Sequence, residues 1–341
     1  MITVPVSLGE RSYDVLVGHG ARRELAGLLP RTANRAAIVT QEAITLDIDP
    51  GMSSEVFWIG EGEAHKSLAT VETLCRGFAR FGLTRNDVVI VVGGGMVTDV
   101  AGFAAASWHR GVPVVHVSTT LVGMVDAAIG GKTGVNLATV NGVGGKNLIG
   151  AFWQPAGVVC DLDALASLPP RELRCGRGEM AKYHFLTGAD LLSMDEAQRI
   201  ATCIEIKAAI VSSDERESGQ RALLNYGHTL AHALEIETDF AIAHGEAVAV
   251  GLVYAAHLAR RLGRIDDRRV DNHYAVVGAY ELDTTLPGGC DRERLIGLMG
   301  RDKKALGEGL TFVLDGPTGV EVVTAVPADA VRDALDEMMQ R

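Results

Sequence analysis

The sequence predicts an α/β fold in two parts, and three observations lead to this expectation. Up to Pro169, short apolar segments alternate with helical segments, as in a sheet covered by helices. A continuous apolar strand at 87–92 runs directly into Gly93-Gly94-Gly95 and a helix. From Arg171 onward, helical patterns dominate. We therefore expect a Rossmann-like α/β domain over residues 1–168 and a mainly helical domain over residues 169–341.

The first half contains short segments rich in β-branched residues, which favour strands. Gly9 and Glu10 mark a turn, so the two segments that flank it are expected to form a hairpin. Ser67 is a plausible N-cap for the helix that follows it, and Ser118-Thr-Thr120 can cap another helix. The expected strands are 2–8, 13–17, 36–40, 55–59, 87–92, 112–117 and 158–162. The expected helices are 21–29, 67–81, 96–107 and a helix that ends at Ala128.

The second half has helical periodicity over most of its length. The expected helices are 171–184, 195–213, 216–236, 245–262, 268–279 and 291–298, and a terminal hairpin is expected at 310–314 and 320–326. No internal repeat and no low-complexity segment interrupts this pattern.

Three glycine-rich segments are candidates for anion binding. Gly93-Gly94-Gly95 lies between a strand and a helix, where glycines let the backbone approach a pyrophosphate; the alternative is an ordinary strand-to-helix turn. Residues 130–134 and 142–147 are read as two glycine-rich loops that carry Lys132 and Lys146. Neither loop has the spacing of a Walker A motif. A lysine in a glycine-rich turn indicates capture of a phosphate or a carboxylate.

A group of histidines indicates a metal site. His228 and His232 are four residues apart, so they share one helical face, and His244 precedes another helical segment. Imidazole nitrogens suit a divalent metal that a carboxylate completes; the alternative is histidines that only cap or bond neighbours. Glu179 and Lys182 lie three residues apart, and this spacing alone favours a solvated ion pair. A buried Glu179 beside His228 and His244 would instead form a two-histidine, one-carboxylate site.

Composition excludes several classes of function. The 341 residues are 47% hydrophobic and 22% charged, and the net charge is −11, which argues against nucleic acid or an anionic membrane as the main partner. No apolar run reaches transmembrane length, and no signal peptide is evident. The five cysteines are scattered without a C-x-x-C pair, which favours reduced thiols and a cytoplasmic location. An anionic substrate would therefore need local basic residues.

Several motifs resemble those of sugar-phosphate cyclases, and within them the 3-dehydroquinate synthase family. They occur in family order and cover nearly the whole chain. The matching segments are 62–66, 93–99, 108–111, 119–121, Asp126, 130–136, 145–152, 178–182, 214–217, 224–229, 244–247 and 302–304.

The resemblance implies a bound NAD and one divalent metal, zinc or cobalt. The implied NAD-contacting residues are Glu63, Lys66, Gly94, Gly95, Met96, Val97, Thr98, Asp99, Thr119, Thr120, Lys132, Lys146, Ala164, Leu165, Ala166 and Ser167. The implied metal ligands are Glu179, His228 and His244. The implied substrate-binding and catalytic residues are Asp126, Lys132, Asn147, Lys182, Lys207, Arg221, Asn225, His232, Lys303 and Lys304, with Arg110 reaching the neighbouring subunit of a homodimer.

The implied reaction converts 3-deoxy-D-arabino-heptulosonate 7-phosphate, an anionic sugar phosphate, to 3-dehydroquinate and phosphate in the shikimate pathway. Its steps are transient oxidation by NAD, phosphate elimination, re-reduction and an intramolecular aldol closure. The alternatives are aminodehydroquinate synthase, 2-epi-5-epi-valiolone synthase, 2-deoxy-scyllo-inosose synthase and a metal-dependent polyol or glycerol-phosphate dehydrogenase. This chain departs from the family pattern at Met96 and Arg177, and it has a longer connection at 137–144 that could form a surface loop.

Overall fold

Short apolar strands build the sheet of the first unit. The computed structural model describes residues 1–140, 143–217, 219–301 and 310–341. The strand order is β1-β2-β9-β6-β5-β3-β4; β1 is antiparallel to β2, and the other neighbours are parallel. The strands are β1 (Ile2–Val6), β2 (Tyr13–Gly18), β3 (Arg35–Thr40), β4 (Ser53–Trp58), β5 (Val88–Gly93), β6 (Val114–Ser118) and β9 (Gly157–Asp161).

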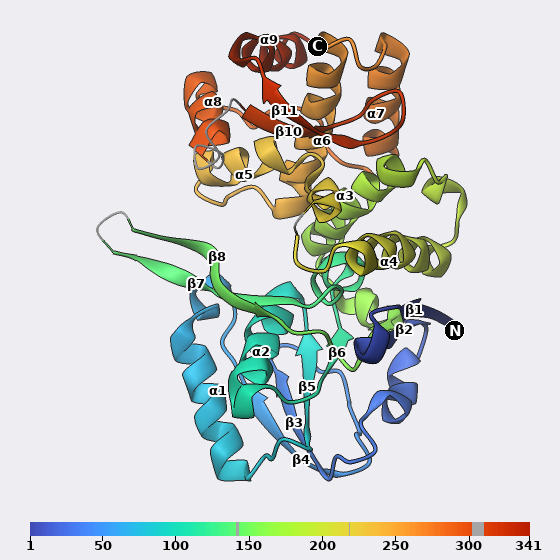
Figure 1. The fold of residues 1–341 in the computed structure, drawn as a ribbon, viewed down its shortest axis with the longest axis vertical. Coiled ribbons are helices and arrows are strands. Elements are labelled where there is room, and N and C mark those ends of the chain that lie inside the picture. The colour runs from blue at the N-terminus through green and yellow to red at the C-terminus, as the bar shows by residue number, and fades with distance from the viewer. Residues whose placement is uncertain (141–142, 218, 302–309) are drawn as a thin grey trace. The chain divides into compact units, whose positions relative to one another are not determined.

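Both faces of this sheet are covered, because adjacent side chains of a strand point to opposite faces. Ala37 and Val39 of β3 pack with α1 (Leu68–Phe81) and α2 (Gly95–Ser107), which lie side by side in Figure 1. Ala36 and Ile38 pack with η2 (Ala21–Leu28) on the other face. The helix expected at 21–29 is thus a 3₁₀ helix. The expected cap is present, since the Ser67 hydroxyl accepts a hydrogen bond from the Thr70 amide at 3.3 Å.

The expectation of glycine-rich loops is wrong for residues 132–134 and 143–147, because these residues lie in the strands of a β-hairpin. β7 (Lys132–Val140) and β8 (Val143–Phe152) pair antiparallel as a separate ribbon, drawn in green in Figure 1. A Cβ on Gly150 would lie 2.1 Å from the Thr133 carbonyl oxygen. Glycine there permits close strand pairing and does not mark a loop. Of the longer connection at 137–144, residues 137–140 lie in β7 and residues 143–144 lie in β8, and residues 141–142 lie outside the described residues.

The second unit is mainly helical and is built around α6. The two units are Met1–Leu168 with Asp195–Ser212, and Pro169–Met194 with Ser213–Arg341. Every residue from 247 to 259 in α6 is buried, and α6 contacts α3, α5, α7 and α9. The helices are α3 (Pro170–Thr187), α5 (His228–Glu237), α6 (His244–Arg261), α7 (Asp267–Ala279), α8 (Arg292–Arg301) and α9 (Ala328–Met339), with a hairpin of β10 (Leu310–Leu314) and β11 (Glu321–Val326).

Three features of the chain differ from the sequence expectation. The helix expected at 216–236 is two elements, η8 (Gln220–Asn225) and α5, because Gly227 adopts a left-handed conformation with φ +80°. The terminal helix α9 is absent from the sequence expectation. Helix α4 (Glu196–Ser213) groups almost entirely with the first unit.

Short helical turns connect the remaining segments. They are η1 (Gly9–Arg11), η3 (Glu63–His65), η4 (Trp108–Arg110), the π-helical η5 (Gly123–Ala127), η6 (Leu162–Ser167) and η7 (Leu191–Ser193). The Thr120 hydroxyl accepts a hydrogen bond from the Gly123 amide at 3.1 Å, so Thr120 caps the helical residues 121–122 that lead into η5. Among the described residues, no helix combines the length and the apolar character needed to cross a bilayer.

Candidate active site

Glycine contacts bring three backbone segments together beside the histidines. A Cβ on Gly178 of α3 would lie 2.0 Å from the Gly245 carbonyl oxygen, and one on Gly245 would lie 1.8 Å from the Cys175 carbonyl oxygen. A Cβ on Gly251 of α6 would lie 1.9 Å from the oxygen of Gly227, the N-cap of α5. Only glycine permits such approaches. They place α3 and α5 directly against α6.

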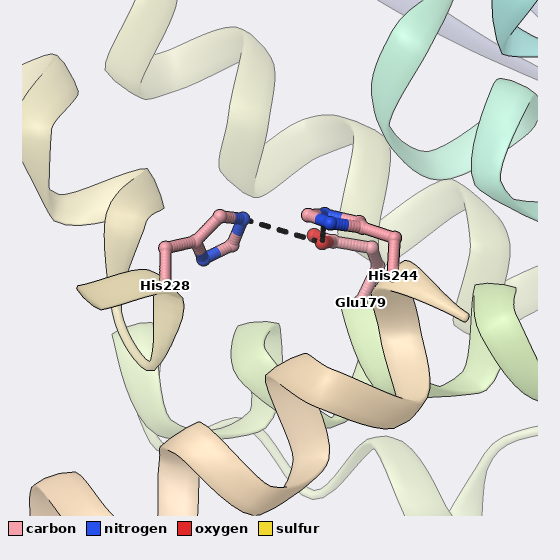
Figure 2. A group of neighbouring side chains, drawn as sticks. All are labelled: Glu179, His228 and His244. Atoms are coloured by element: carbon pink, nitrogen blue, oxygen red, sulfur yellow. Dashed lines mark hydrogen bonds and ion pairs between the residues drawn. The ribbon is translucent and has the colours of Figure 1, made fainter. Parts of the chain in front are cut away.

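Each of these contacts adjoins a candidate metal ligand. Glu179 follows Gly178, His228 follows Gly227, and His244 precedes Gly245. The Glu179 Oε1 atom lies 3.1 Å from His244 Nε2 and 3.4 Å from His228 Nε2 (Figure 2). The three ligand atoms lie within 4.8 Å of one another. The structure thus brings Glu179, His228 and His244 together from α3, α5 and α6.

The protonation states of Glu179 and His228 suit metal binding. Burial by itself raises the pKa of Glu179, but Lys182 and hydrogen bonds with both histidines lower it more, so its pKa lies well below the usual value. Burial lowers the pKa of His228, against the opposing effect of Glu179. The Nδ1 atom of His228 lies 3.1 Å from the Tyr226 carbonyl oxygen and donates to it. The lone pair of Nε2 is then available to a metal. Glu179 is therefore an anion, and His228 is a neutral base.

Glu179 and Lys182 form a buried pair, so the solvated ion pair that spacing alone favours is wrong. Their side chains are 0% and 1% exposed, and Lys182 Nζ lies 2.5 Å from Glu179 Oε2. The other carboxylate oxygen of Glu179 faces the two histidines. One carboxylate thus neutralises a buried cation and completes the histidine group.

Two further basic residues are buried at predicted substrate positions. In the first unit, Lys207 is 5% exposed, and its Nζ donates to the Asp126 carbonyl oxygen at 2.6 Å and to the Asp126 carboxylate. In the second unit, Arg221 is 1% exposed, and its guanidinium Nη1 donates to the Glu215 carbonyl oxygen at 2.5 Å. Burial of a cation is costly without partners, which each of these residues has.

Close packing of side chains requires glycine in the turn after β5. A Cβ on Gly93 would lie 2.5 Å from a Val97 methyl carbon, and one on Gly94 would lie 2.7 Å from a Thr120 methyl carbon. Gly94 is the N-cap of α2 and provides no side-chain cap, so the first turn of α2 resembles the anion-binding helix ends of dinucleotide sites. The predicted positions Gly95, Met96, Val97 and Thr98 form this first turn, and Thr119 donates its amide to the Gly93 oxygen at 3.0 Å.

A second group of predicted cofactor residues lies beside the β7–β8 hairpin. Lys66 Nζ lies 2.5 Å from Asp99 Oδ2, and Lys66 is 6% exposed. Burial raises the pKa of Asp99, although Lys66 opposes this shift. The Asn136 side chain donates to Glu63 Oε1 at 2.7 Å and accepts from the Asn147 amide at 2.9 Å. Asn136 thus joins predicted cofactor and substrate positions of the first unit.

The remaining predicted residues lie at the surface, in η6 or outside the described part. Arg110, Lys132, Lys146, Asn147, Asn225 and His232 are exposed. The His232 ring centroid lies 5.5 Å from that of His228, but His232 is not one of the three clustered ligands. Residues 164–167 belong to η6. Lys303 and Lys304 lie outside the described residues.

Two polar residues next to the predicted sites were missed from the sequence. In the sequence, Asn136 stands out only as the last residue of the matching segment 130–136. Glu235 lies seven residues after His228 and three after His232, and this spacing puts it on the same face of α5. Its Oε2 atom lies 3.5 Å from His244 Nδ1. Helical spacing from the two histidines was the signal that could have found it.

The fold, the glycine turn and the buried Glu–His–His group define an α/β protein of the dehydroquinate synthase-like kind. The family profile for the N-terminal part of 3-dehydroquinate synthase matches residues 56–175, and that for the C-terminal part matches residues 176–305. This chain belongs to the 3-dehydroquinate synthase family.

Two similar proteins and one solved structure illustrate the range within this fold. A provisionally named aminodehydroquinate synthase of Amycolatopsis mediterranei is 53% identical over 98% of this chain and 94% of its own length. The 3-dehydroquinate synthase of Nitrobacter winogradskyi is 41% identical over 98% of this chain and 95% of its own length. A 2-deoxy-scyllo-inosose synthase, solved with carbaglucose-6-phosphate, NAD⁺ and Co²⁺, is 24% identical with a TM-score of 0.87, covering 98% of this chain and all of that one. The last of these establishes similarity of fold.

Proposed function

We propose that the protein is a metal- and NAD-dependent cyclase that closes a heptulosonate 7-phosphate into a carbocycle and releases phosphate. The observation that carries the proposal is the buried Glu179–His228–His244 group beside Lys182, in a chain of this family. We also infer that it works in the cytoplasm, consistent with five free cysteines, and as a homodimer to which Arg110 contributes across the interface.

The donor set fits one divalent zinc or cobalt ion. Two imidazoles and a carboxylate are a common catalytic set that leaves positions open for substrate oxygens. The ion, when bound, would act as a Lewis acid and stabilise negative charge that develops on a substrate hydroxyl oxygen. Glu179, His228 and His244 would hold it. Lys182 keeps Glu179 ionised and therefore ready to bind.

The first unit fits NAD at the β5–α2 turn. Gly93 and Gly94 form the turn between β5 and α2, and the start of α2 offers backbone amides to a pyrophosphate. NAD would supply a reversible hydride transfer at a secondary alcohol, with no net consumption. The residues proposed to contact it are Glu63, Lys66, Gly94–Asp99, Thr119, Thr120, Lys132, Lys146 and Ala164–Ser167.

Buried cations in an acidic protein support an anionic substrate. Although the net charge is −11, Lys182, Lys207 and Arg221 are each at most 5% exposed. Cations placed in such surroundings bind phosphate and carboxylate strongly because little water screens them. These residues would hold and orient the acid, with Asp126, Lys132, Asn147, Asn225, His232, Lys303 and Lys304 completing the substrate contacts.

Two substrates of this class are candidates. The first is 3-deoxy-D-arabino-heptulosonate 7-phosphate, which would make the protein a 3-dehydroquinate synthase. The second is its amino analogue, and a specific observation favours it: 53% identity to the Amycolatopsis protein against 41% to the Nitrobacter synthase. We therefore expect the higher kcat/KM with the amino analogue.

Phosphate release is the measurement that tests this function. With NAD and Co²⁺ or Zn²⁺, each candidate substrate should release one phosphate per carbocycle formed, without accumulation of NADH. Steady NADH formation would instead identify a dehydrogenase, and absence of phosphate release from both compounds would overturn the proposal. The ratio of the two kcat/KM values decides between the substrates.

Removal of the metal should stop turnover. Treatment with a chelator is expected to abolish phosphate release, and added Co²⁺ or Zn²⁺ should restore it. His228→Ala removes one ligand and should prevent this restoration while far-ultraviolet circular dichroism remains unchanged. Full activity of a demonstrably metal-free preparation would contradict the assignment of the metal.

A further inference from the structure

The two ring nitrogens of His244 face two different carboxylates. Nε2 lies 3.1 Å from Glu179 Oε1, on the side of the ligand cluster. Nδ1 lies 3.5 Å from Glu235 Oε2, on the opposite edge of the ring. The Glu235 side chain is only 12% exposed, and the His244 side chain is 33% exposed. A largely buried carboxylate therefore stands behind the histidine, outside the ligand cluster itself.

His228 has the same arrangement with a different acceptor. Its Nε2 lies 3.4 Å from Glu179 Oε1, and its Nδ1 lies 3.1 Å from the Tyr226 carbonyl oxygen. A neutral imidazole that offers Nε2 to a metal carries its proton on Nδ1. Both histidines therefore place the Nδ1 proton opposite an acceptor, a carbonyl for His228 and a carboxylate for His244. The shared pattern indicates a role that goes beyond an incidental ion pair.

A carboxylate behind a metal-bound histidine has two physical effects. It fixes the orientation and the tautomer of the ring, and it makes the ligating nitrogen more basic. His244 needs such support more than His228 does, because its side chain is 33% exposed against 11%. It is also the first residue of α6, so its backbone lies at a helix end. Glu235 is anchored on a different helix, α5, and can hold the ring from outside the ligand cluster.

We propose that Glu235 is a positioning residue of the metal centre, which holds His244 with Nδ1 protonated and Nε2 directed at the ion. This inference rests on the proposed metal-dependent function and adds to it a residue outside the ligand set. Glu235 does not touch the ion or the substrate in this account. It acts through His244.

Metal affinity is the direct test. We would measure Co²⁺ binding to the full-length protein by competition with a chromophoric chelator, and record the visible spectrum of the bound Co²⁺. Glu235→Ala should weaken Co²⁺ binding by roughly 10- to 100-fold, as is typical for loss of such a partner. Glu235→Gln should weaken it less, because the amide oxygen still accepts a proton from Nδ1. Both variants should shift the Co²⁺ spectrum, which a purely structural role would leave unchanged.

Glu237→Gln is the matched control. Glu237 lies on the same helix with its side chain 6% exposed, but it pairs with Arg294 at 2.9 Å and accepts from the Asp291 amide at 3.1 Å. Its substitution should leave Co²⁺ affinity and spectrum unchanged. An equal loss of Co²⁺ affinity in Glu237→Gln and Glu235→Gln would mean that removing any charge from α5 weakens the metal site. That result would overturn the positioning role of Glu235.

The outcomes separate this inference from the proposed function. If the wild-type protein binds Co²⁺ and Glu235→Gln binds it with the same affinity and spectrum, Glu235 has no positioning role. If the wild-type protein binds no divalent metal, the proposed function itself fails. Should Glu235→Ala fail to fold, Glu235→Gln still decides the question, because it conserves the volume of the side chain.

Discussion

At the scale of single residues, the buried lysines and arginine of the described part of the chain coincide with positions that the family resemblance named. Lys182, Lys207 and Arg221 are almost fully buried, and the first two pair directly with Glu179 and Asp126. Leaving one member of a buried pair alone costs about 3–5 kcal/mol, so such pairs are retained only where other interactions compensate. Residue types and spacing could not predict this burial, since the same Glu179–Lys182 spacing also occurs on exposed helices.

His116 allows a prediction about stability and pH. It lies in β6, is 3% exposed, and burial lowers its pKa to about 4. In the unfolded chain the pKa of His116 is near 6.5. Below about pH 6.5, His116 therefore binds a proton in the unfolded chain and stays neutral in the folded chain. This histidine should therefore cost roughly 2 kcal/mol of folding free energy between pH 8 and pH 5.

The comparison with His116→Leu isolates this contribution. Urea unfolding at pH 8 and pH 5 should show a smaller loss of stability for the variant than for the wild type. Because other groups also titrate in this range, the difference between the two proteins is the quantity that matters. Equal pH dependence in both would show that His116 is not the buried neutral base described above.

At the scale of elements, glycines decide how closely the helices of the second unit approach one another. Gly178 and Gly245 bring α3 onto α6, and Gly227 and Gly251 bring α5 onto α6. The proposed ligands Glu179, His228 and His244 are the neighbours of these glycines in sequence. The proposed metal centre is therefore a product of helix packing and does not arise from one local motif.

Gly178→Ala tests this packing. The added methyl would lie 2.0 Å from the Gly245 carbonyl oxygen, so α3 and α6 must separate. We expect a loss of about 3 kcal/mol or more in unfolding free energy, together with weaker Co²⁺ binding. Gly297→Ala in α8 is the control, since its methyl would meet no atom within 4 Å and should stabilise that helix by about 0.5–1 kcal/mol. Similar stability changes in both variants would contradict the packing argument.

Asn136 connects the β7–β8 hairpin to the turn that contains Glu63 and Lys66. Its side chain bonds Glu63 and the Asn147 amide, and its own amide donates to the Lys66 oxygen at 2.9 Å. Asn147 has a positive φ of 56°, which costs free energy and needs such support. Asn136→Asp keeps the acceptor for Asn147 but places a carboxylate against Glu63.

We expect Asn136→Asp to weaken NAD binding about tenfold, from one lost hydrogen bond and one new repulsion. It should also increase amide exchange in β7 and β8. The double variant Glu63→Gln with Asn136→Asp reverses donor and acceptor, so it should restore the protection of the hairpin. If protection is unchanged in the single variant, Asn136 does not hold the hairpin in place.

Sequence patterns predicted the sheet well, because buried parallel strands are short, apolar and bounded by turns. They failed where non-local packing or a single torsion angle decides the structure. Residues 132–152 contain five glycines and lack clear alternation, so the pairing of β7 with β8 depends on contacts across the strands. Gly227 ends one element and begins another through its positive φ. Helix α9 could have been predicted, because Ala330, Ala334 and Met338 recur at helical spacing.

At the scale of the whole molecule, the proposed metal should stabilise the two units unequally, because all three ligands belong to the second unit. At a free Co²⁺ concentration one hundred times Kd, binding adds about 2.7 kcal/mol to the state that binds it. Hydrogen exchange should slow in α3, α5 and α6, with little change in the strands of the first sheet. An equal slowing of hydrogen exchange in both units would indicate that the two units unfold together and not separately.

Helix α4 has a consequence for exchanging parts between relatives. The chain passes from the first unit to the second at Leu168–Pro169, returns at Met194–Asp195, and leaves again at Ser212–Ser213. A chimaera joined once, after residue 168, would give the first unit a foreign α4 and separate Asp126 from its own Lys207. A chimaera that keeps each unit intact needs three junctions. In it, residues 195–212 come from the same parent protein as residues 1–168. Recombination at a single crossover, in the laboratory or in a genome, would therefore tend to produce mismatched partners.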